Sequence, residues 1–235
     1  MGEMVTYPAN GHSTAGYLST PASGTGPGLL VIQEWWGLVD HIKTVADRFA
    51  AAGFMALAPD FYSGQTTKSP DAAAKLFMAL NIDRAGADLR GSADYLLALP
   101  GVVSEKVGAL GFCMGGQLAL YAGMAYPDRI GCVVDFYGIH PHVPIDPTRL
   151  RVPVLGHFGA RDGSIPAPAV AQLAAAVNDA GGRFEPHYYE ADHAFFNDTR
   201  PEVYNPEAAR LAWERTIAFL RLHLGPDETE LGAVG

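Results

Sequence analysis

The chain has 235 residues, 49% of them hydrophobic and only 17% charged, so it can bury a sizeable core and is not expected to be disordered. Its net charge of −9 argues against nucleic acid as a partner, because an acidic surface repels a phosphate backbone. No run approaches eighteen apolar residues, the first residues lack the features of a secretory signal, and there are only two cysteines. We therefore expect no membrane partner and a cytoplasmic location without a disulfide framework.

The first half of the chain alternates apolar runs with helical periodicity. A continuous apolar run at 28–35 predicts a strand that is covered on both faces, and residues 40–52 follow with helical spacing. The next predicted strand, 54–62, leads through a polar loop into a helical region from about 71 to 99. We expect this region to break or kink at two internal glycines, Gly86 and Gly91.

The second half repeats the alternation. The remaining predicted strands are 106–112, 130–138, 152–159 and 184–190. The remaining predicted helices are 115–126, 166–180 and a last one that begins at Asn205-Pro206 and ends before Gly225. A polar tail, 227–235, is expected to fray. Strands that alternate with helices predict an α/β fold, with a mostly parallel sheet covered on both faces and a single domain over 1–235.

One turn points to chemistry. The predicted strand 106–112 runs into GFCMGG (111–116), which places Cys113 between Gly111 and Gly115 directly before a helix. This is the G-x-nucleophile-x-G pattern of a nucleophile elbow, in which a Cβ at either glycine would clash. The following helix points its N-terminus at the thiol, which favours a thiolate and a developing oxyanion. We interpret Cys113 as a nucleophile and Cys132, in an apolar strand run, as a buried core thiol.

A thiol nucleophile needs a base and a carboxylate that orients it. In folds with such an elbow the chain order is nucleophile, acid, histidine. Asp162 follows the predicted strand 152–159 and His193 follows 184–190, so both lie at the sheet edge where ligands bind. Asp135 is an alternative acid, and Asp192 is a poor one because neighbouring side chains on an extended loop diverge.

Two further histidines, His140 and His142, form an H-x-H pair that could belong to a metal site. The pair lacks other clustered ligands, so the sequence predicts no metal and no cofactor.

At this point the chain resembles the dienelactone hydrolase family of α/β-hydrolases. The resemblance rests on five stretches in the same order, VIQEWWG (31–37), FMALAPDFY (54–62), GFCMGG (111–116), GARDGSIP (159–166) and EADHAFF (190–196). It implies an α/β-hydrolase fold and a role for Glu34, which in the family contacts the thiol and accepts its proton when substrate binds. It also implies an oxyanion hole made by the backbone N–H groups of Trp35 and Met114.

The chain departs from the family where substrate is selected. Asn197 stands where the family has an arginine that binds a substrate carboxylate, and a second such arginine is missing around Lys75. Lys75 or Arg200 could substitute, although lysine offers no bidentate fork. Candidate pocket aromatics, for which core packing is an equal alternative, are Trp35, Trp36, Phe77, Tyr137, Phe195 and Phe196.

Together these features predict a cysteine-dependent hydrolase of small esters or lactones, with a Cys113–His193–Asp162 triad and an acyl-enzyme intermediate. A thiolate is a good leaving group, so activated esters are expected rather than peptides. Two different functions would also fit a hydrolase fold with a cysteine at this turn, a non-catalytic binding protein and a thiol redox enzyme. The oligomeric state does not follow from the sequence.

Overall fold

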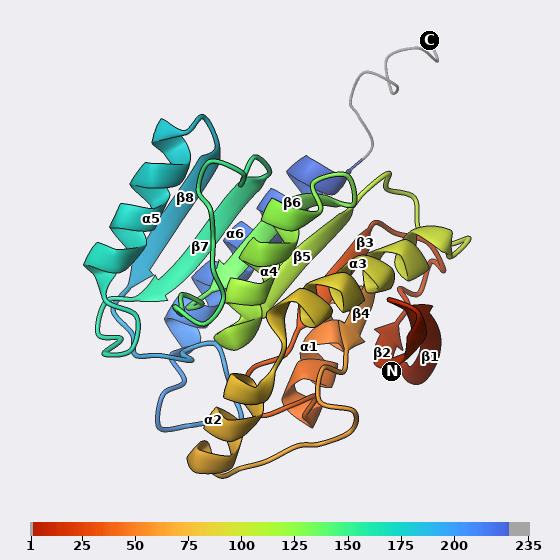
Figure 1. The fold of residues 1–235 in the computed structure, drawn as a ribbon, viewed down its shortest axis with the longest axis horizontal. Coiled ribbons are helices and arrows are strands. Elements are labelled where there is room, and N and C mark those ends of the chain that lie inside the picture. The colour runs from red at the N-terminus through yellow and green to blue at the C-terminus, as the bar shows by residue number, and fades with distance from the viewer. Residues whose placement is uncertain (1, 226–235) are drawn as a thin grey trace.

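The computed structural model describes residues 2–225, and its strands form one sheet of eight in the order β1-β2-β4-β3-β5-β6-β7-β8 (Figure 1). The strands are β1 Glu3–Ala9, β2 His12–Ser19, β3 Gly28–Ile32, β4 Met55–Pro59, β5 Val107–Phe112, β6 Ile130–Phe136, β7 Pro153–Gly159 and β8 Arg183–Tyr189. The six strands from β3 to β8 are parallel to one another, whereas β1 and β2 pair antiparallel at one edge. The predicted mostly parallel sheet is confirmed.

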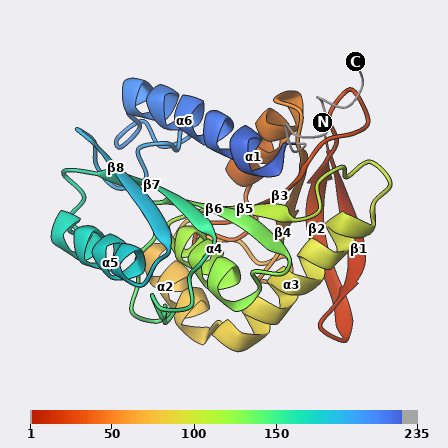
Figure 2. The same ribbon diagram turned by 90° about the horizontal axis from the view of Figure 1, so that it is seen from above.

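Helices cover both faces of this sheet, as Figure 2 shows from above. The helices are α1 Asp40–Ala51, α2 Pro70–Ala79, α3 Ile82–Ala98, α4 Met114–Ala125, α5 Ala167–Asp179 and α6 Pro206–Leu224. Helices α1 and α6 lie on one face, and α3, α4 and α5 lie on the other. Two hydrophobic clusters result, one between the sheet and each helical layer. Both faces of a central strand are therefore dry, which explains why β3 and β5 are apolar at every position.

The central strands end earlier than predicted. The apolar run 28–35 forms a strand only as far as Ile32, and the run 54–62 only from Met55 to Pro59. The residues after each strand leave the ladder at the carboxyl edge of the sheet. Glu34 and Trp35 therefore lie in a loop beyond β3 rather than within the sheet.

The antiparallel hairpin of β1 and β2 was not among the predicted elements. Its turn is Asn10-Gly11, and both residues have positive φ, 50° and 75°. An Asn-Gly pair is the sequence signal for a two-residue hairpin turn, because both positions need the left-handed region. The hairpin thus carries its own signal in the sequence.

The expected break of the helical region lies elsewhere. The chain divides into α2 and α3 at Leu80, and Asn81 caps α3 by accepting a hydrogen bond from the N–H of Arg84 (2.8 Å). Gly86 and Gly91 lie inside an unbroken α3. A Cβ would lie 2.4 Å from the ring of Tyr121 at Gly86 and 2.4 Å from Ala9 at Gly91. These glycines allow close packing rather than a kink.

No helix within residues 2–225 is long and apolar enough to cross a membrane. The tail that the sequence predicts to fray, 227–235, lies outside the described residues.

Candidate active site

Loops from four parallel strands meet at the carboxyl edge of the sheet. Glu34 follows β3, Cys113 follows β5, Asp162 follows β7 and His193 follows β8. Parallel strands end at a common edge, so the topology brings together residues that are up to 159 positions apart in the printed sequence.

The turn around Cys113 has the strained geometry of an elbow. Cys113 has φ 54° and ψ −118°, which is unusual for a residue with a side chain, and its N–H donates to the carbonyl of Phe136 (2.9 Å). A Cβ at Gly111 would lie 2.0 Å from the carbonyl oxygen of Gly115, and one at Gly115 would lie 2.4 Å from that of Ile32. The expected steric need for both glycines is confirmed, and the thiol is left partly exposed beyond the strand end.

Asp162 and His193 are in direct contact. His193 Nδ1 lies 2.6 Å from Asp162 Oδ2. The other oxygen, Oδ1, accepts hydrogen bonds from the N–H groups of Ser164 (2.8 Å) and Ile165 (3.0 Å). Three donors converge on a buried carboxylate, which stabilises its anion and fixes its direction. An ionised Asp162 makes Nδ1 of the imidazole the protonated nitrogen and leaves Nε2 for the thiol.

The electrostatics of His193 favour the imidazolium. Burial by itself opposes the charged ring, but hydrogen bonds with Asp162 and Cys113 outweigh burial and raise the pKa of His193 to about 10. The ring is therefore coupled on one side to a carboxylate and on the other to the thiol.

Glu34 is buried beside these groups, with 1% of its surface exposed. Its Oε2 accepts a hydrogen bond from Asn197 Nδ2 at 3.0 Å. Burial raises the pKa of Glu34 above its ordinary value, while His193, Asn197 and Arg200 oppose that rise. A carboxyl group with a raised pKa is suited to accepting a proton.

The backbone N–H groups of Trp35 and Met114 are among those at the site that have no acceptor within the described part of the chain. Met114 is the first residue of α4, so its N–H belongs to the free N-terminal turn of the helix.

Two residues near the site have a strained backbone, since Tyr137 has φ 44° and Ala194 has φ 62°. Strained residues held in place by their surroundings concentrate at functional sites.

A cavity of about 490 Å³ joins these groups. Its volume lies within the range of small-molecule sites. Of the residues singled out in the sequence, its walls contain Glu34, Trp35, Trp36, Phe77, Cys113, Met114, Tyr137, His140, His193 and Arg200.

Comparison with known proteins gives a consistent result. The model of the dienelactone hydrolase family matches residues 14–224, almost all of the chain. The chain belongs to the dienelactone hydrolase family. "Protein usf" of Aquifex pyrophilus is 38% identical over 95% of this chain and 100% of its own length. The "Putative carboxymethylenebutenolidase" of Aquifex aeolicus is 33% identical with the same coverage.

Solved structures agree with this family membership. The crystal structure of a "Putative Dienelactone Hydrolase" from Klebsiella pneumoniae superposes with a TM-score of 0.85 and 28% identity, and covers 94% of this chain and 98% of that one. Like the dienelactone hydrolases, this chain has the α/β-hydrolase fold and is a carboxylic ester hydrolase.

Asn197, at the position where the resemblance led us to expect an arginine, is buried and bonded to Glu34. An amide held in this way positions Glu34 and offers no charge to a substrate. Lys75 is exposed on α2 and lines neither of the two cavities at this edge. Arg200 lines both cavities, and its Nε donates to Glu202 (2.8 Å).

Phe195, Asp135 and Asp192 line neither of the two cavities. Phe195 lies fully buried between Tyr137 and Tyr189, with ring centroids 5.5 and 5.2 Å away. Asp135 is buried in β6 and accepts from the N–H of Gly138 (2.8 Å). Asp192 pairs with Arg161 at the surface (3.6 Å).

The second cysteine is placed as predicted. Cys132 is fully buried in β6, and burial raises the pKa of its thiol.

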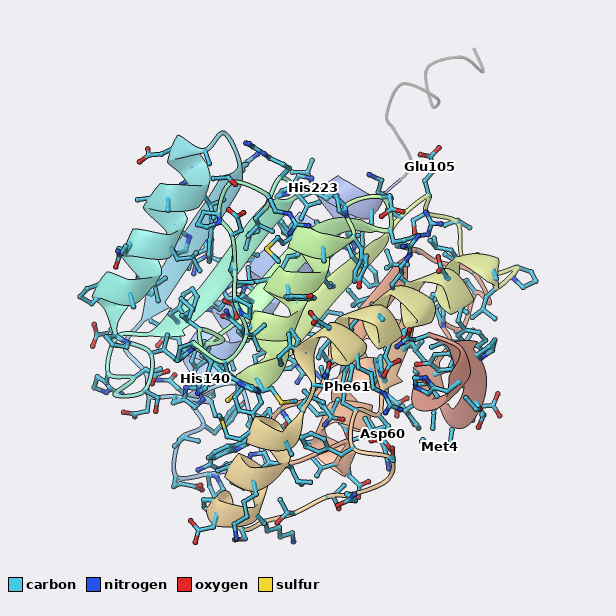
Figure 3. The ribbon with its side chains drawn as sticks, in the orientation of Figure 1. Met4, Asp60, Phe61, Glu105, His140 and His223 are labelled. Carbon is cyan, nitrogen blue, oxygen red and sulfur yellow. The ribbon has the colours of Figure 1, made fainter. Side chains whose placement is uncertain are left out.

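Sequence reasoning missed the wall formed by the loop after β6. Ile139, His140 (labelled in Figure 3) and Pro141 line the cavity. The ring of His140 packs with its centroid 4.8 Å from that of Phe77. His140 Nδ1 accepts from the N–H of His142 (3.1 Å). The H-x-H pair is thus part of the packing between this loop and α2, and within residues 2–225 no group of three metal-ligating side chains is assembled. A loop that follows a central strand was the available signal.

Proposed function

We propose that residues 1–235 form a single hydrolase domain that cleaves small esters or lactones through a thioester intermediate on Cys113. The observation that carries the proposal is the 2.6 Å contact between His193 and Asp162, in a cavity whose wall contains both His193 and the elbow cysteine Cys113. An imidazole fixed in this way between an acid and a nucleophile is the arrangement that acyl transfer requires.

The reaction follows from the positions of the groups. The Cys113 thiolate attacks the carbonyl carbon, and the N–H groups of Trp35 and Met114 stabilise the oxyanion. The intermediate collapses to a thioester as the imidazolium of His193 protonates the leaving alkoxide. Neutral His193 then takes a proton from water, which attacks the thioester and releases the acid and the thiolate. Asp162 holds the ring tautomer and stabilises its cation in both halves.

Glu34 has a separate role in the proposal. The resting thiol keeps its proton beside a buried carboxylate, because two neighbouring negative charges repel. When substrate enters, Glu34 takes the thiol proton and the thiolate forms beside the imidazolium. Its raised pKa supports this role, and Asn197 holds the carboxyl group in place. A thiol that is protonated at rest is also protected from oxidation.

The proposed substrates are small, activated and neutral. A thiolate leaves readily from its own tetrahedral intermediate, which favours esters and enol lactones over amides. Neutral esters should be preferred to those with a carboxylate, since Asn197 brings no charge to the site, and Arg200 is the residue that could reverse this preference. The mechanism uses no cofactor, and its proposed location is the cytoplasm. Because Cys132 is buried in the sheet, it is poorly placed to act with Cys113 in a redox enzyme.

Turnover of p-nitrophenyl acetate tests the proposal. Cys113→Ala should abolish activity while the far-UV circular dichroism stays native, and iodoacetamide should inactivate the wild type. Cys132→Ala is the matched control, and it should keep most of the activity. Full turnover by Cys113→Ala would end the catalytic interpretation and leave a binding protein as the better explanation.

A further inference from the structure

The buried carboxylate of Glu34 accepts a single hydrogen bond within residues 2–225, from Nδ2 of Asn197 at 3.0 Å. Both side chains are almost fully buried, with 1% and 3% of their surfaces exposed. A buried carboxylate without donors tends to hold a proton, because burial disfavours its charged form. A protonated Glu34 could not take the proton of the Cys113 thiol. The end of the amide that faces Glu34 therefore matters for the proposed reaction.

Thr199 fixes which end of the amide faces Glu34. Oδ1 of Asn197 accepts hydrogen bonds from the backbone N–H of Thr199 (3.1 Å) and from its hydroxyl Oγ1 (2.6 Å). A backbone N–H can only donate, so the amide oxygen must be the atom that faces Thr199. The NH₂ group at the other end is then left to donate to the carboxylate.

The backbone on both sides of Asn197 is also held. Its N–H donates to the carbonyl of Ala194 (2.9 Å), and its carbonyl accepts from the N–H of Arg200 (3.1 Å). The next residue, Asp198, lies 3.4 Å from Nδ1 of His41 on α1. The segment that carries the amide therefore has little freedom to turn.

Other titratable and charged groups share the catalytic cavity with Glu34, namely Cys113, Tyr137, His193 and Arg200. His193 and Arg200 favour the anion of Glu34 through their positive charges, without a hydrogen bond to it within residues 2–225. Nε of Arg200 donates instead to Glu202 (2.8 Å). The amide of Asn197 is thus the contact through which the ionisation of Glu34 can be altered while the triad stays intact.

We propose that Thr199 and Asn197 form a donor chain, in which Thr199 orients the amide and the amide keeps Glu34 ionised until substrate enters. The inference rests on the proposed function, because it concerns the group that takes the thiol proton there. In that step the S–H bond of Cys113 breaks, an O–H bond forms on Glu34, and the negative charge passes to Sγ. Oε1 of Glu34 accepts no hydrogen bond within residues 2–225 and is the oxygen free to take the proton. Thr199 is a positioning residue in this chain.

The pH profile of kcat/KM for p-nitrophenyl acetate tests the donor chain, because its acid limb reports an essential ionisation of the free enzyme. Asn197→Leu removes the donor at similar volume. The acid limb should move to higher pH by about one to two pKa units, as expected for one lost hydrogen bond to a charged group. A loss of structure alone would lower kcat/KM at every pH and leave the limb in place.

Thr199→Val removes the hydroxyl and keeps the backbone N–H. Thr199 is exposed and lines a second cavity at this edge, of about 1030 Å³, so the valine should not unfold the protein. We expect the acid limb to move in the same direction by less than about one unit, since the amide loses one of its two donors. Thr199→Ser keeps the hydroxyl and should keep the wild-type profile.

Asp198→Asn is the matched control. Asp198 lies between the two residues of the donor chain but contacts His41, so the acid limb should stay where the wild type has it. An unmoved limb in Asn197→Leu or in Thr199→Val, or an equal shift in Asp198→Asn, would overturn the inference. If Asn197→Leu does not fold, Thr199→Val and Thr199→Ser decide the matter.

Two different failures can be told apart. Turnover that persists in Cys113→Ala would refute the proposed function itself. An inactive Cys113→Ala together with unmoved acid limbs would refute only the donor chain.

Discussion

Asp135 lies in β6, and Asp162 lies in the loop after the neighbouring strand β7. Both residues are buried. They differ in the donors that surround them. Asp135 receives one hydrogen bond, from the N–H of Gly138, its Oδ2 has no partner in the described chain, and burial raises its pKa well above the ordinary range. Asp162 receives three, one of them from His193.

Depth of burial therefore does not select the acid of a triad. Burial alone favours the neutral carboxyl group, which cannot stabilise an imidazolium. Converging N–H donors favour the carboxylate anion, and they also fix the direction of the carboxylate oxygen that contacts the histidine. The loop after β7 supplies those donors and the interior of β6 does not.

The largest effect should come from Asp162→Asn. The amide can no longer stabilise the imidazolium, and it permits the wrong tautomer of His193, so kcat for p-nitrophenyl acetate should fall by about 10⁴. Asp135→Asn should lower kcat by less than about tenfold. A larger loss in Asp135→Asn than in Asp162→Asn would show that the acid is on β6.

Asp162→Asn and Asp135→Asn should also differ in how their stability depends on pH, and Asp162→Asn is considered first. Partners raise the pKa of His193 to about 10, against roughly 6.5 in an unfolded chain. The free energy that these partners of His193 contribute to folding is therefore fully present below about pH 6.5 and is lost as the pH rises through 10.

Urea unfolding of the wild type and of Asp162→Asn across this range should give a difference in unfolding free energy that shrinks as the pH rises. The difference at the lower end should be on the order of a few kcal/mol. Parallel curves would contradict the coupling between Asp162 and His193.

Asp135→Asn should stabilise the protein at neutral pH. The raised pKa means that the folded protein holds this proton to a higher pH than the unfolded chain does, and this costs stability above about pH 4. Asparagine removes that cost and keeps an oxygen for the N–H of Gly138. The melting temperature should exceed that of the wild type at pH 7 and match it near pH 3. A lower melting temperature at pH 7 would mean that Asp135 is ionised and paired.

Glu34→Gln should also raise the melting temperature at pH 7, and by the smallest amount of these variants. Burial raises the pKa of Glu34, but His193, Asn197 and Arg200 act against it. The glutamine keeps an acceptor for Asn197. The melting temperature at pH 7 should rise less than in Asp135→Asn, and iodoacetamide should label Cys113 faster because a neighbouring negative charge is gone. Slower labelling would argue against Glu34 as the group that keeps the thiol protonated.

Much of the fold and the proposed triad could be predicted because each depends on a local pattern. The two glycines around Cys113 follow from the sterics of one turn, within five residues. Asp162 and His193 each follow a buried apolar strand, and parallel strands bring such positions to one edge whatever their separation. The hairpin at Asn10-Gly11 is equally local, since its turn signal lies in two adjacent residues.

Other features depended on contacts between distant segments. Asn197 and Glu34 are 163 positions apart, and no periodicity shows that the amide holds the carboxyl group. Phe195 and Tyr137 are both aromatic residues next to the edge, yet only Tyr137 reaches the cavity. Gly86 and Gly91 predict a kink until Tyr121 and Ala9 are seen to fill the space beside them. Local patterns constrain the backbone through sterics, whereas side-chain partners are chosen by packing, which exists only when the whole chain is assembled.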